Sequence, residues 1–194
     1  MSLFGASGHA KVIMDIIAAQ GDNVGKLYDD NPHCRQLKNR PVLFAPEARV
    51  EGPMIISIGS NEIRKRISGR YPLQYAKAVH PSAIVSPSAS VGSGSVVMQG
   101  AIIQADARVG KHCIINTGAS VDHECVIDDF VHISPHATLC GNVHVGEGSW
   151  IGAATTIIPG IRIGKWCTIG AGSVVVKDVP DGSTAYGDPC RIID

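Results

Sequence analysis

Hydrophobic residues recur at every sixth position through the second half of the chain. From Val79 to Val175, seventeen consecutive sixth positions hold Val, Ile or Leu. The position four residues further on is mostly small, as at Ala83, Ala101 and Cys113. Because a helix has a period of 3.6 and a flat strand a period of 2, neither explains a strict period of six. The pattern predicts a parallel β-helix with one short strand per repeat and three repeats per coil.

The repeat also assigns roles to positions within each coil. The first position is expected to fill the axis of the helix, and the small residue to lie beside it, so that five to six coils share one core. Cys113, Cys125 and Cys167 fall on the small position and are interpreted as core residues. Residues at intervening positions are predicted to form tight corners with positive φ. These are Gly92, Gly110, Asn116, Gly146, Gly152, Gly164 and Gly170.

The first 78 residues lack this period and predict a separate α/β domain. Short apolar segments at residues 2–4, 24–28 and 54–58 are predicted strands, and an amphipathic helix is expected from Ala10 to Gln20. A second, basic helix runs through Ile67. This order favours a small Rossmann-like βαβαβ sheet. We therefore expect domains at residues 1–78 and 79–179, followed by a C-terminal tail at 180–194.

Polar and glycine-rich turns follow two of the predicted strands. In the turn from Gly5 to His9, Gly5 and Gly8 would let a phosphate approach the backbone at a helix N-terminus. Asp29 and Asp30 end the next strand, where carboxylates could accept hydrogen bonds from a ribose or a base. Taken alone, this two-glycine motif fits an ordinary strand–helix turn capped by Ser7 equally well.

Composition excludes several classes of function. The chain has 17 Lys and Arg and 17 Asp and Glu, and no basic stretch, which argues against a nucleic-acid partner. No apolar run approaches the length of a membrane span, and no signal segment opens the chain. We therefore expect a cytoplasmic protein whose six cysteines are reduced.

The histidines raise the question of a metal site or a catalytic base. Side chains eighteen residues apart stack on adjacent coils, and no two of the later histidines have that spacing; these are His112, His123, His132, His136 and His144. No metal site is expected within one subunit, while a site between subunits stays open. His123 lies between Asp122 and Glu124, and a carboxylate beside an imidazole strengthens a general base. A solvent-exposed histidine on a polar corner remains the alternative.

These motifs together resemble bacterial hexapeptide-repeat nucleotide-sugar acyltransferases, in particular the UDP-4-amino-sugar N-acetyltransferases of bacillosamine synthesis. Sialic acid O-acetyltransferases share the layout. The resemblance rests on the repeat array and on residues 5–9, 28–30, 58–64 and 122–126. It implies a left-handed β-helix, acetyl-CoA as co-substrate, no metal, and a homotrimer with active sites between subunits.

The resemblance also implies roles for individual residues. His123 would be the general base, with Glu124 raising its basicity. The UDP-sugar would be held by Ser7, Gly8, His9, Asp29, Asp30 and Gly59. Acetyl-CoA would contact His132 and the backbone at Ala153 and Ala171. The segment from Tyr186 to Arg191 resembles a closing turn near the CoA tail.

The implied reaction is direct transfer of acetyl from acetyl-CoA to the C4 amine of a UDP-4-amino-4,6-dideoxy-sugar in a ternary complex. Two alternatives remain at this point. One is O-acetylation of sialic acid or another sugar, which has less need of a uridine pocket. The other is a non-catalytic trimeric scaffold, which the adjacent His123 and Glu124 disfavour.

Overall fold

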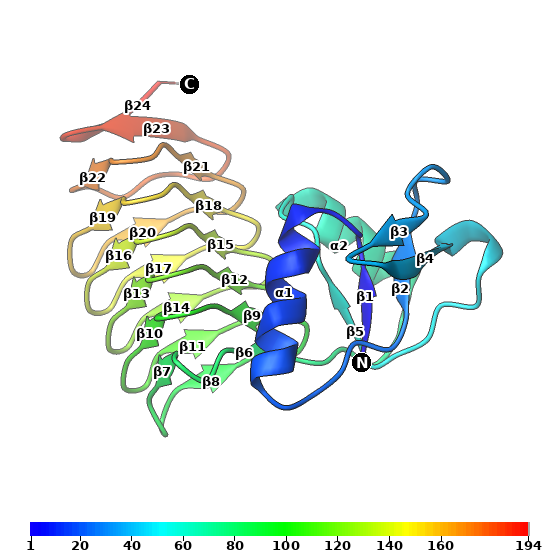
Figure 1. Ribbon diagram of the computed structural model, residues 1–194. Helices are drawn as coiled ribbons and strands as arrows, with labels where there is room; N and C mark the ends of the chain where they lie inside the picture. The colour runs from blue at the N-terminus through cyan, green and yellow to red at the C-terminus, as the bar shows by residue number, and fades with distance from the viewer. Residues whose placement is uncertain (194) are drawn as a thin grey trace.

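The computed structural model describes residues 1–193, which form an α/β domain packed against a parallel β-helix (Figure 1). The α/β domain contains β1 (Ser2–Phe4), α1 (Gly8–Ala19), β2 (Leu27–Asp29), β3 (Gln36–Leu37), β4 (Arg40–Phe44), a 3-10 turn (Ala45–Glu47), β5 (Met54–Ile56) and α2 (Asn61–Arg70). Neither helix is long and apolar enough to cross a membrane, and no other helix among the described residues is.

The sheet of this domain has the order β3-β4-β2-β1-β5. Strands β4, β2, β1 and β5 are parallel, which confirms the predicted α/β sheet, and β3 pairs antiparallel with β4 at the edge. The predicted βαβαβ order was wrong in one respect, because β2 and β5 are joined by the β3–β4 hairpin and a 3-10 turn instead of a helix. Short, half-exposed strands around the Lys38-Asn39 turn, whose φ values are 46° and 60°, carry no clear hydrophobic period.

Helix α1 joins the two domains through an apolar face. Ile13, Ile16 and Ile17 of α1 are buried, as expected for one face of the amphipathic helix; Ala10 is buried with them, and Val12, expected on the same face, is only partly buried. They share a hydrophobic cluster with Leu3 and Ile55 of the sheet and with the outward residues of the first coils of the β-helix; these are Ala78, Val96 and Ile114. Because burial of apolar area drives this contact, the α/β domain is fixed on one side of the β-helix.

Seventeen two-residue strands build the β-helix, one for each sequence repeat. They are β6 (Ala78–Val79), β7 (Ile84–Val85), β8 (Ser90–Val91), β9 (Val96–Val97), β10 (Ile102–Ile103), β11 (Arg108–Val109), β12 (Ile114–Ile115), β13 (Ser120–Val121), β14 (Val126–Ile127), β15 (His132–Ile133), β16 (Thr138–Leu139), β17 (His144–Val145), β18 (Trp150–Ile151), β19 (Thr156–Ile157), β20 (Arg162–Ile163), β21 (Thr168–Ile169) and β22 (Val174–Val175).

The strands stack into three parallel sheets, which we call faces 1, 2 and 3. Face 1 runs from β6 to β21 and is extended by β23 (Thr184–Gly187) and β24 (Cys190–Ile192). Face 2 runs from β7 to β22 and face 3 from β8 to β20. Each coil therefore contains three repeats, and the strands form five complete coils and part of a sixth, as predicted. The α/β domain lies against face 1 (Figure 1).

The interior of the β-helix matches the roles assigned to the repeat. Inward residues such as Ile103 and Ile133 and small residues such as Ala101 are fully buried and belong to one continuous cluster. Cys113, at the small position, is also fully buried, and burial raises the pKa of its thiol to about 12. Cys125 and Cys167 are buried at the same position, so all three cysteines pack in the core, as predicted.

The predicted role of the corner glycines was wrong. None of the seven positions has positive φ, which occurs instead three residues after most of the inward residues, as at Gly94 (76°) and Glu124 (59°). The glycines are needed because consecutive coils approach closely. A Cβ at Gly92 would lie 2.5 Å from the carbonyl carbon of Gly110, one coil away.

This close approach predicts that Gly146→Ala destabilises the β-helix. The added Cβ would lie 2.6 Å from the backbone of Gly164, so we expect the free energy of unfolding to fall by about 1–3 kcal/mol in denaturant titrations. Gly69→Ala in α2 is the control, since a Cβ there meets nothing within 4 Å and alanine favours the helix. Equal stability of Gly146→Ala and wild type would contradict the steric argument.

Candidate functional site

The turn between β1 and α1 leaves open space at the start of the helix. Gly5 has a φ of 100°, and the backbone N–H of Ala6 donates to the Asp29 carboxylate at 2.7 Å. A Cβ at Gly8 would meet nothing within 4 Å. Ser7 occupies the N-cap position, but its side chain makes no capping hydrogen bond. The first turn of α1 is therefore accessible to a ligand that accepts hydrogen bonds.

The two aspartates lie at the end of β2, and each already has a partner. Asp29 accepts hydrogen bonds from the N–H groups of Ala6 and Asn31, at 2.7 and 2.8 Å. Both oxygens of Asp30 accept from Arg70 at the end of α2, at 2.7 and 2.6 Å. Asp29 thus orders the turn before α1.

The neighbouring turn after β5 carries Gly59. A Cβ at Gly59 would also meet nothing within 4 Å, so its outer side is open. Ser60 caps α2, because its hydroxyl accepts from the N–H of Ile63 at 3.4 Å. The first turns of both helices therefore begin beside open glycines at one edge of the sheet.

Two histidines, the buried His132 and the half-buried His9, lie where the α/β domain meets face 1. His132 stacks beneath the ring of Trp150, with centroids 5.8 Å apart, and its Nε2 lies 3.0 Å from the Asn116 amide. Nδ1 of His132 and Nε2 of His9 are buried without a hydrogen-bond partner among the described residues. Such free buried polar atoms are rare unless a ligand or water satisfies them.

Both histidines are neutral at pH 7. Burial, helped by the positive charge of Arg64, lowers the pKa of His9 to about 4. Burial and the charge of Arg64 lower the pKa of His132 to about 3. The Gly59 backbone acts in the opposite direction and raises this pKa, but by less. The seam between the domains therefore offers two uncharged imidazoles near the Gly59 turn.

His123 lies in the turn between β13 and β14 and faces a cavity of about 480 Å³. Its Nδ1 is 3.2 Å from the Glu124 carboxylate, so the proton on Nδ1 is assigned to that contact and Nε2 is left to accept a proton. The ring lies over Gly141, one coil further on, where a Cβ would come within 2.5 Å of Cε1 and Nε2.

A single chain does not bring all the predicted site residues together. His123 lies on the edge between faces 2 and 3, whereas His9, Gly59 and His132 lie on the side of face 1 (Figure 1). Ala153 and Ala171 occupy equivalent turns on the edge between faces 1 and 2. Neither of their N–H groups donates a hydrogen bond within residues 1–193.

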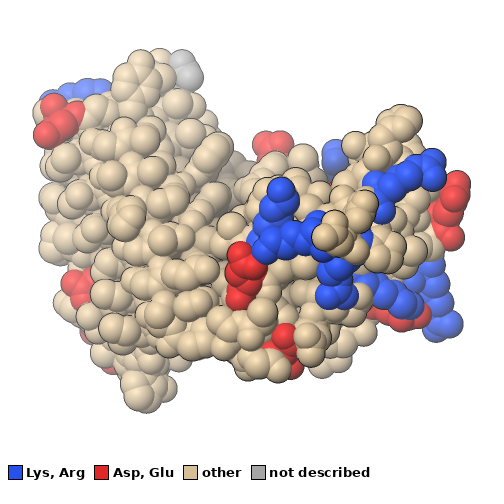
Figure 2. Space-filling view, viewed as in Figure 1, with Lys and Arg blue, Asp and Glu red and all other residues tan. Residues whose placement is uncertain are grey.

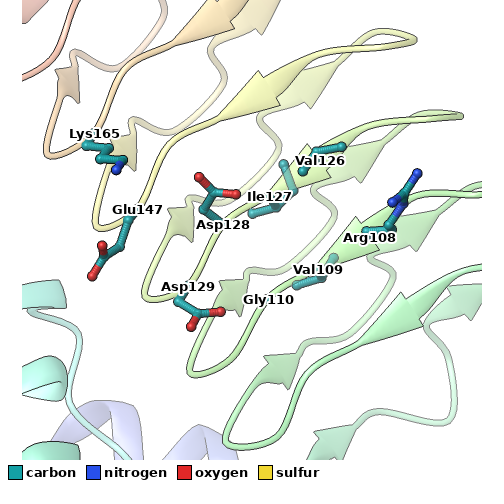
Figure 3. A pocket seen from close by; sticks show the side chains of 9 residues that line it. All are labelled: Arg108, Val109, Gly110, Val126, Ile127, Asp128, Asp129, Glu147 and Lys165. Atoms are coloured by element: carbon teal, nitrogen blue, oxygen red, sulfur yellow. The ribbon is translucent and has the colours of Figure 1, made fainter.

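Face 3 has another hollow of about 440 Å³, which holds none of the predicted site residues. It is lined by Arg108, Val109, Gly110, Val126, Ile127, Asp128, Asp129, Glu147 and Lys165 (Figure 3). Asp129 accepts a hydrogen bond from the backbone N–H of Lys111, one coil away, so its carboxylate stabilises the turn at Lys111. Within residues 1–193, no group of three or more His, Cys, Asp or Glu side chains could hold a metal ion.

Sequence reasoning missed Asn116, Gly141 and the role of Arg64. The eighteen-residue spacing from His123 points directly to Gly141, so that contact was accessible from the repeat. Asn116 reaches His132 diagonally, at a spacing of sixteen residues, which the stacking rule does not cover. The contacts of Arg64 cross from one domain to the other, so no local pattern reveals them.

Comparisons with known proteins show the family to which this chain belongs. Residues 1–71 match the family described as the PglD N-terminal domain, and residues 142–177 match the bacterial transferase hexapeptide (six repeats). The structure is similar to a histidine-to-asparagine variant of perosamine N-acetyltransferase from Caulobacter crescentus, in complex with CoA and GDP-perosamine. The TM-score is 0.92 and the identity 35%, over 100% of this chain and 96% of that one. The chain belongs to the PglD family of hexapeptide-repeat sugar N-acetyltransferases.

Two further members of the family show how far the likeness extends. The acetyltransferase domain of PglB from Neisseria gonorrhoeae, in complex with acetyl coenzyme A, has a TM-score of 0.90 and 36% identity, with 99% and 98% of the two chains covered. UDP-N-acetylbacillosamine N-acetyltransferase of Bacillus subtilis is 44% identical over 109 residues, which is 50% of each chain. The match thus spans about half the length of that curated relative.

The neutral histidines predict that stability falls on acidification. The pKa values of His9 and His132 lie below the ordinary 6.5, so the unfolded chain binds more protons as the pH falls through 6.5. We expect the free energy of unfolding to drop by about 1 kcal/mol for each histidine between pH 7.5 and 5.5. His112, whose pKa burial lowers to about 4, adds to the same trend. Denaturant titrations that gave equal stability at both pH values would contradict this.

The contact between His123 and Gly141 predicts a mutant with an intact fold and an altered site. Gly141→Ala places a methyl group 2.5 Å from the His123 ring, and the ring can move because its side chain is 58% exposed. We expect a shift of the His123 imidazole NMR signals and a Tm within a few degrees of wild type. Gly69→Ala, where a Cβ meets nothing within 4 Å and φ is not positive, is the control for a glycine substitution that makes no new contact. Unchanged His123 signals would show that the ring does not lie over Gly141.

Proposed function

We propose that this protein transfers acetyl from acetyl-CoA to the C4 amine of a UDP-4-amino-4,6-dideoxy-sugar. The observation that carries the proposal is the His123–Glu124 pair, which leaves Nε2 free beside an open cavity. Family membership supports acetyl transfer to a sugar, and the relatives in complex with CoA or acetyl coenzyme A support the donor. The likeness to the Bacillus subtilis enzyme supports the UDP-linked acceptor.

In the proposed reaction His123 acts as a general base. The sugar amine attacks the thioester carbonyl, Nε2 of His123 removes the amine proton, and the carbon–sulfur bond breaks to release CoA thiolate. Glu124 stabilises the imidazolium that forms, since its carboxylate lies 3.2 Å from Nδ1. The free N–H groups at Ala153 and Ala171 are the proposed backbone contacts of acetyl-CoA, and one of them could stabilise the oxyanion.

The nucleotide sugar would bind at the edge of the sheet. We place the diphosphate against the open turns at Gly8 and Gly59, and the base towards Asp29 and Asp30. The free nitrogens of His9 and His132 would then face the sugar. In the view of Figure 2, Lys and Arg gather over the α/β domain, while most of the visible β-helix surface is uncharged, which favours an anionic ligand on the α/β side.

A trimer would complete this site, because His123 and the sugar pocket lie on different edges of one chain. Face 2 separates the edge with His123 from the edge with Ala153 and Ala171. Its outward side chains are all uncharged: Ile84, Ile102, Ser120, Thr138, Thr156 and Val174. Packing three copies of face 2 around a three-fold axis would bring the two edges of neighbouring subunits together.

Mass spectrometry of the products tests the reaction. Wild-type protein with acetyl-CoA is expected to acetylate a UDP-4-amino-4,6-dideoxy-N-acetylhexosamine, and His123→Ala to slow transfer by about 100-fold or more. Free sialic acid is offered separately as the acceptor of the O-acetyltransferase alternative. Transfer to sialic acid alone would overturn the proposed acceptor, and transfer to neither would favour the scaffold. Full activity of His123→Ala would remove the proposed base.

Mixed trimers test whether sites are shared between subunits. His123→Ala removes the base, and Gly8→Glu places a carboxylate in the open turn proposed for the diphosphate. Each variant alone should be inactive, whereas co-expression should restore about a quarter of wild-type activity, because one site in four then combines an intact base with an intact pocket. Mixtures that stay inactive, although mass analysis shows mixed trimers, would place the whole site within one chain.

A further inference from the structure

Arg64 is the largest fully buried side chain of the protein, at 1% exposure. All five of its N–H groups donate hydrogen bonds. Nε donates to the His112 carbonyl at 3.0 Å, Nη1 to the carbonyls of Ile58 and Gly59 at 3.1 and 2.8 Å, and Nη2 to the Asn61 side chain and the Phe130 carbonyl at 2.8 and 2.9 Å. The guanidinium therefore has no donor left for a ligand.

These bonds join the Gly59 turn to the β-helix. Three acceptors belong to residues 58–61, and the other two, His112 and Phe130, belong to turns of the β-helix before β12 and β15. Asn61 continues the link by donating to the carbonyls of Gly148 and Ser149 before β18. One side chain thus fixes the position of the Gly59 turn relative to His132 in β15.

The positive charge of Arg64 has no carboxylate partner among residues 1–193. A buried charge is costly without a counter-charge, and carbonyl dipoles offset only part of that cost. Burial accordingly lowers the pKa of Arg64 to about 10. The charge of Arg64 lowers the pKa values of His9 and His132. Both imidazoles are therefore uncharged, and neither supplies a negative partner.

We propose that Arg64 is a positioning residue for the nucleotide sugar: it holds the Gly59 turn against β15, and its buried positive charge is offset by the diphosphate bound on the open side of that turn. This inference rests on the proposed nucleotide-sugar acceptor. It explains why a cation is buried at the seam without an acidic partner. It also separates two tasks, because the turn contacts the ligand while Arg64 acts through the turn.

Titration calorimetry with UDP, uridine and CoA tests the proposal. Arg64→Met should weaken UDP binding by about tenfold to a hundredfold, while the affinities for uridine and CoA change by less than about threefold. Arg64→Lys keeps the charge but loses the planar set of five donors, so it should recover part of the UDP affinity. Arg66→Met is the matched control, since it removes an exposed charge from the same helix.

Equal weakening of UDP and uridine would show a merely structural role, and UDP affinity unchanged in Arg64→Met would overturn the proposal. If both Arg64 variants fail to fold, NMR spectra of the wild type test the proposal instead. The buried guanidinium should give slowly exchanging NMR signals, which UDP must shift and uridine must not. If UDP does not shift these signals, the proposal that the diphosphate offsets the charge of Arg64 is contradicted.

These measurements do not depend on acetyl transfer. A wild type that binds UDP in the expected way but acetylates no UDP-amino-sugar would refute the proposed function and leave the role of Arg64 standing. A wild type that acetylates its acceptor while Arg64→Met binds UDP normally would refute only the inference.

Discussion

The position of every proposed site residue on the β-helix depends on the stacking of coils eighteen residues long. The inward Val, Ile and Leu residues fix this register, because a slip by one position would turn the buried ladder outward. Glycines such as Gly92 let consecutive coils approach closely enough for backbone hydrogen bonds. The same stacking lays the His123 ring over Gly141 and the His132 ring beneath Trp150. A regular scaffold thus holds irregular, functional side chains in fixed places.

The two domains divide the proposed chemistry between them. The α/β domain supplies open helix N-termini beside Gly8 and Gly59, and the β-helix supplies His123, His132 and the free backbone N–H groups. Arg64 links the two domains, because it donates three hydrogen bonds to residues 58–61 of the α/β domain and two to His112 and Phe130 of the β-helix. Because His123 lies on a different edge from the turns proposed to bind the sugar, the proposed function requires neighbouring subunits to complete each site.

Much of this could be predicted from the sequence, for physical reasons that differ between regions. The repeat predicted the coils and the buried cysteines because a strict period leaves only one arrangement. It did not reveal the steric role of Gly92, since tight corners and close coil contacts both select glycine. The β3–β4 hairpin was missed because its half-exposed strands have no period. Arg64 and Asn116 act through contacts distant in sequence, which patterns along the chain do not record.

The most direct test of the account is a crystal structure of the protein with UDP-amino-sugar and CoA bound. We expect the diphosphate against the Gly8 and Gly59 turns and the sugar amine within hydrogen-bond distance of Nε2 of a neighbouring subunit's base. We expect no contact between Arg64 and the ligand. A nucleotide bound elsewhere, or a sugar amine facing His123 of the same chain that holds the nucleotide, would contradict it.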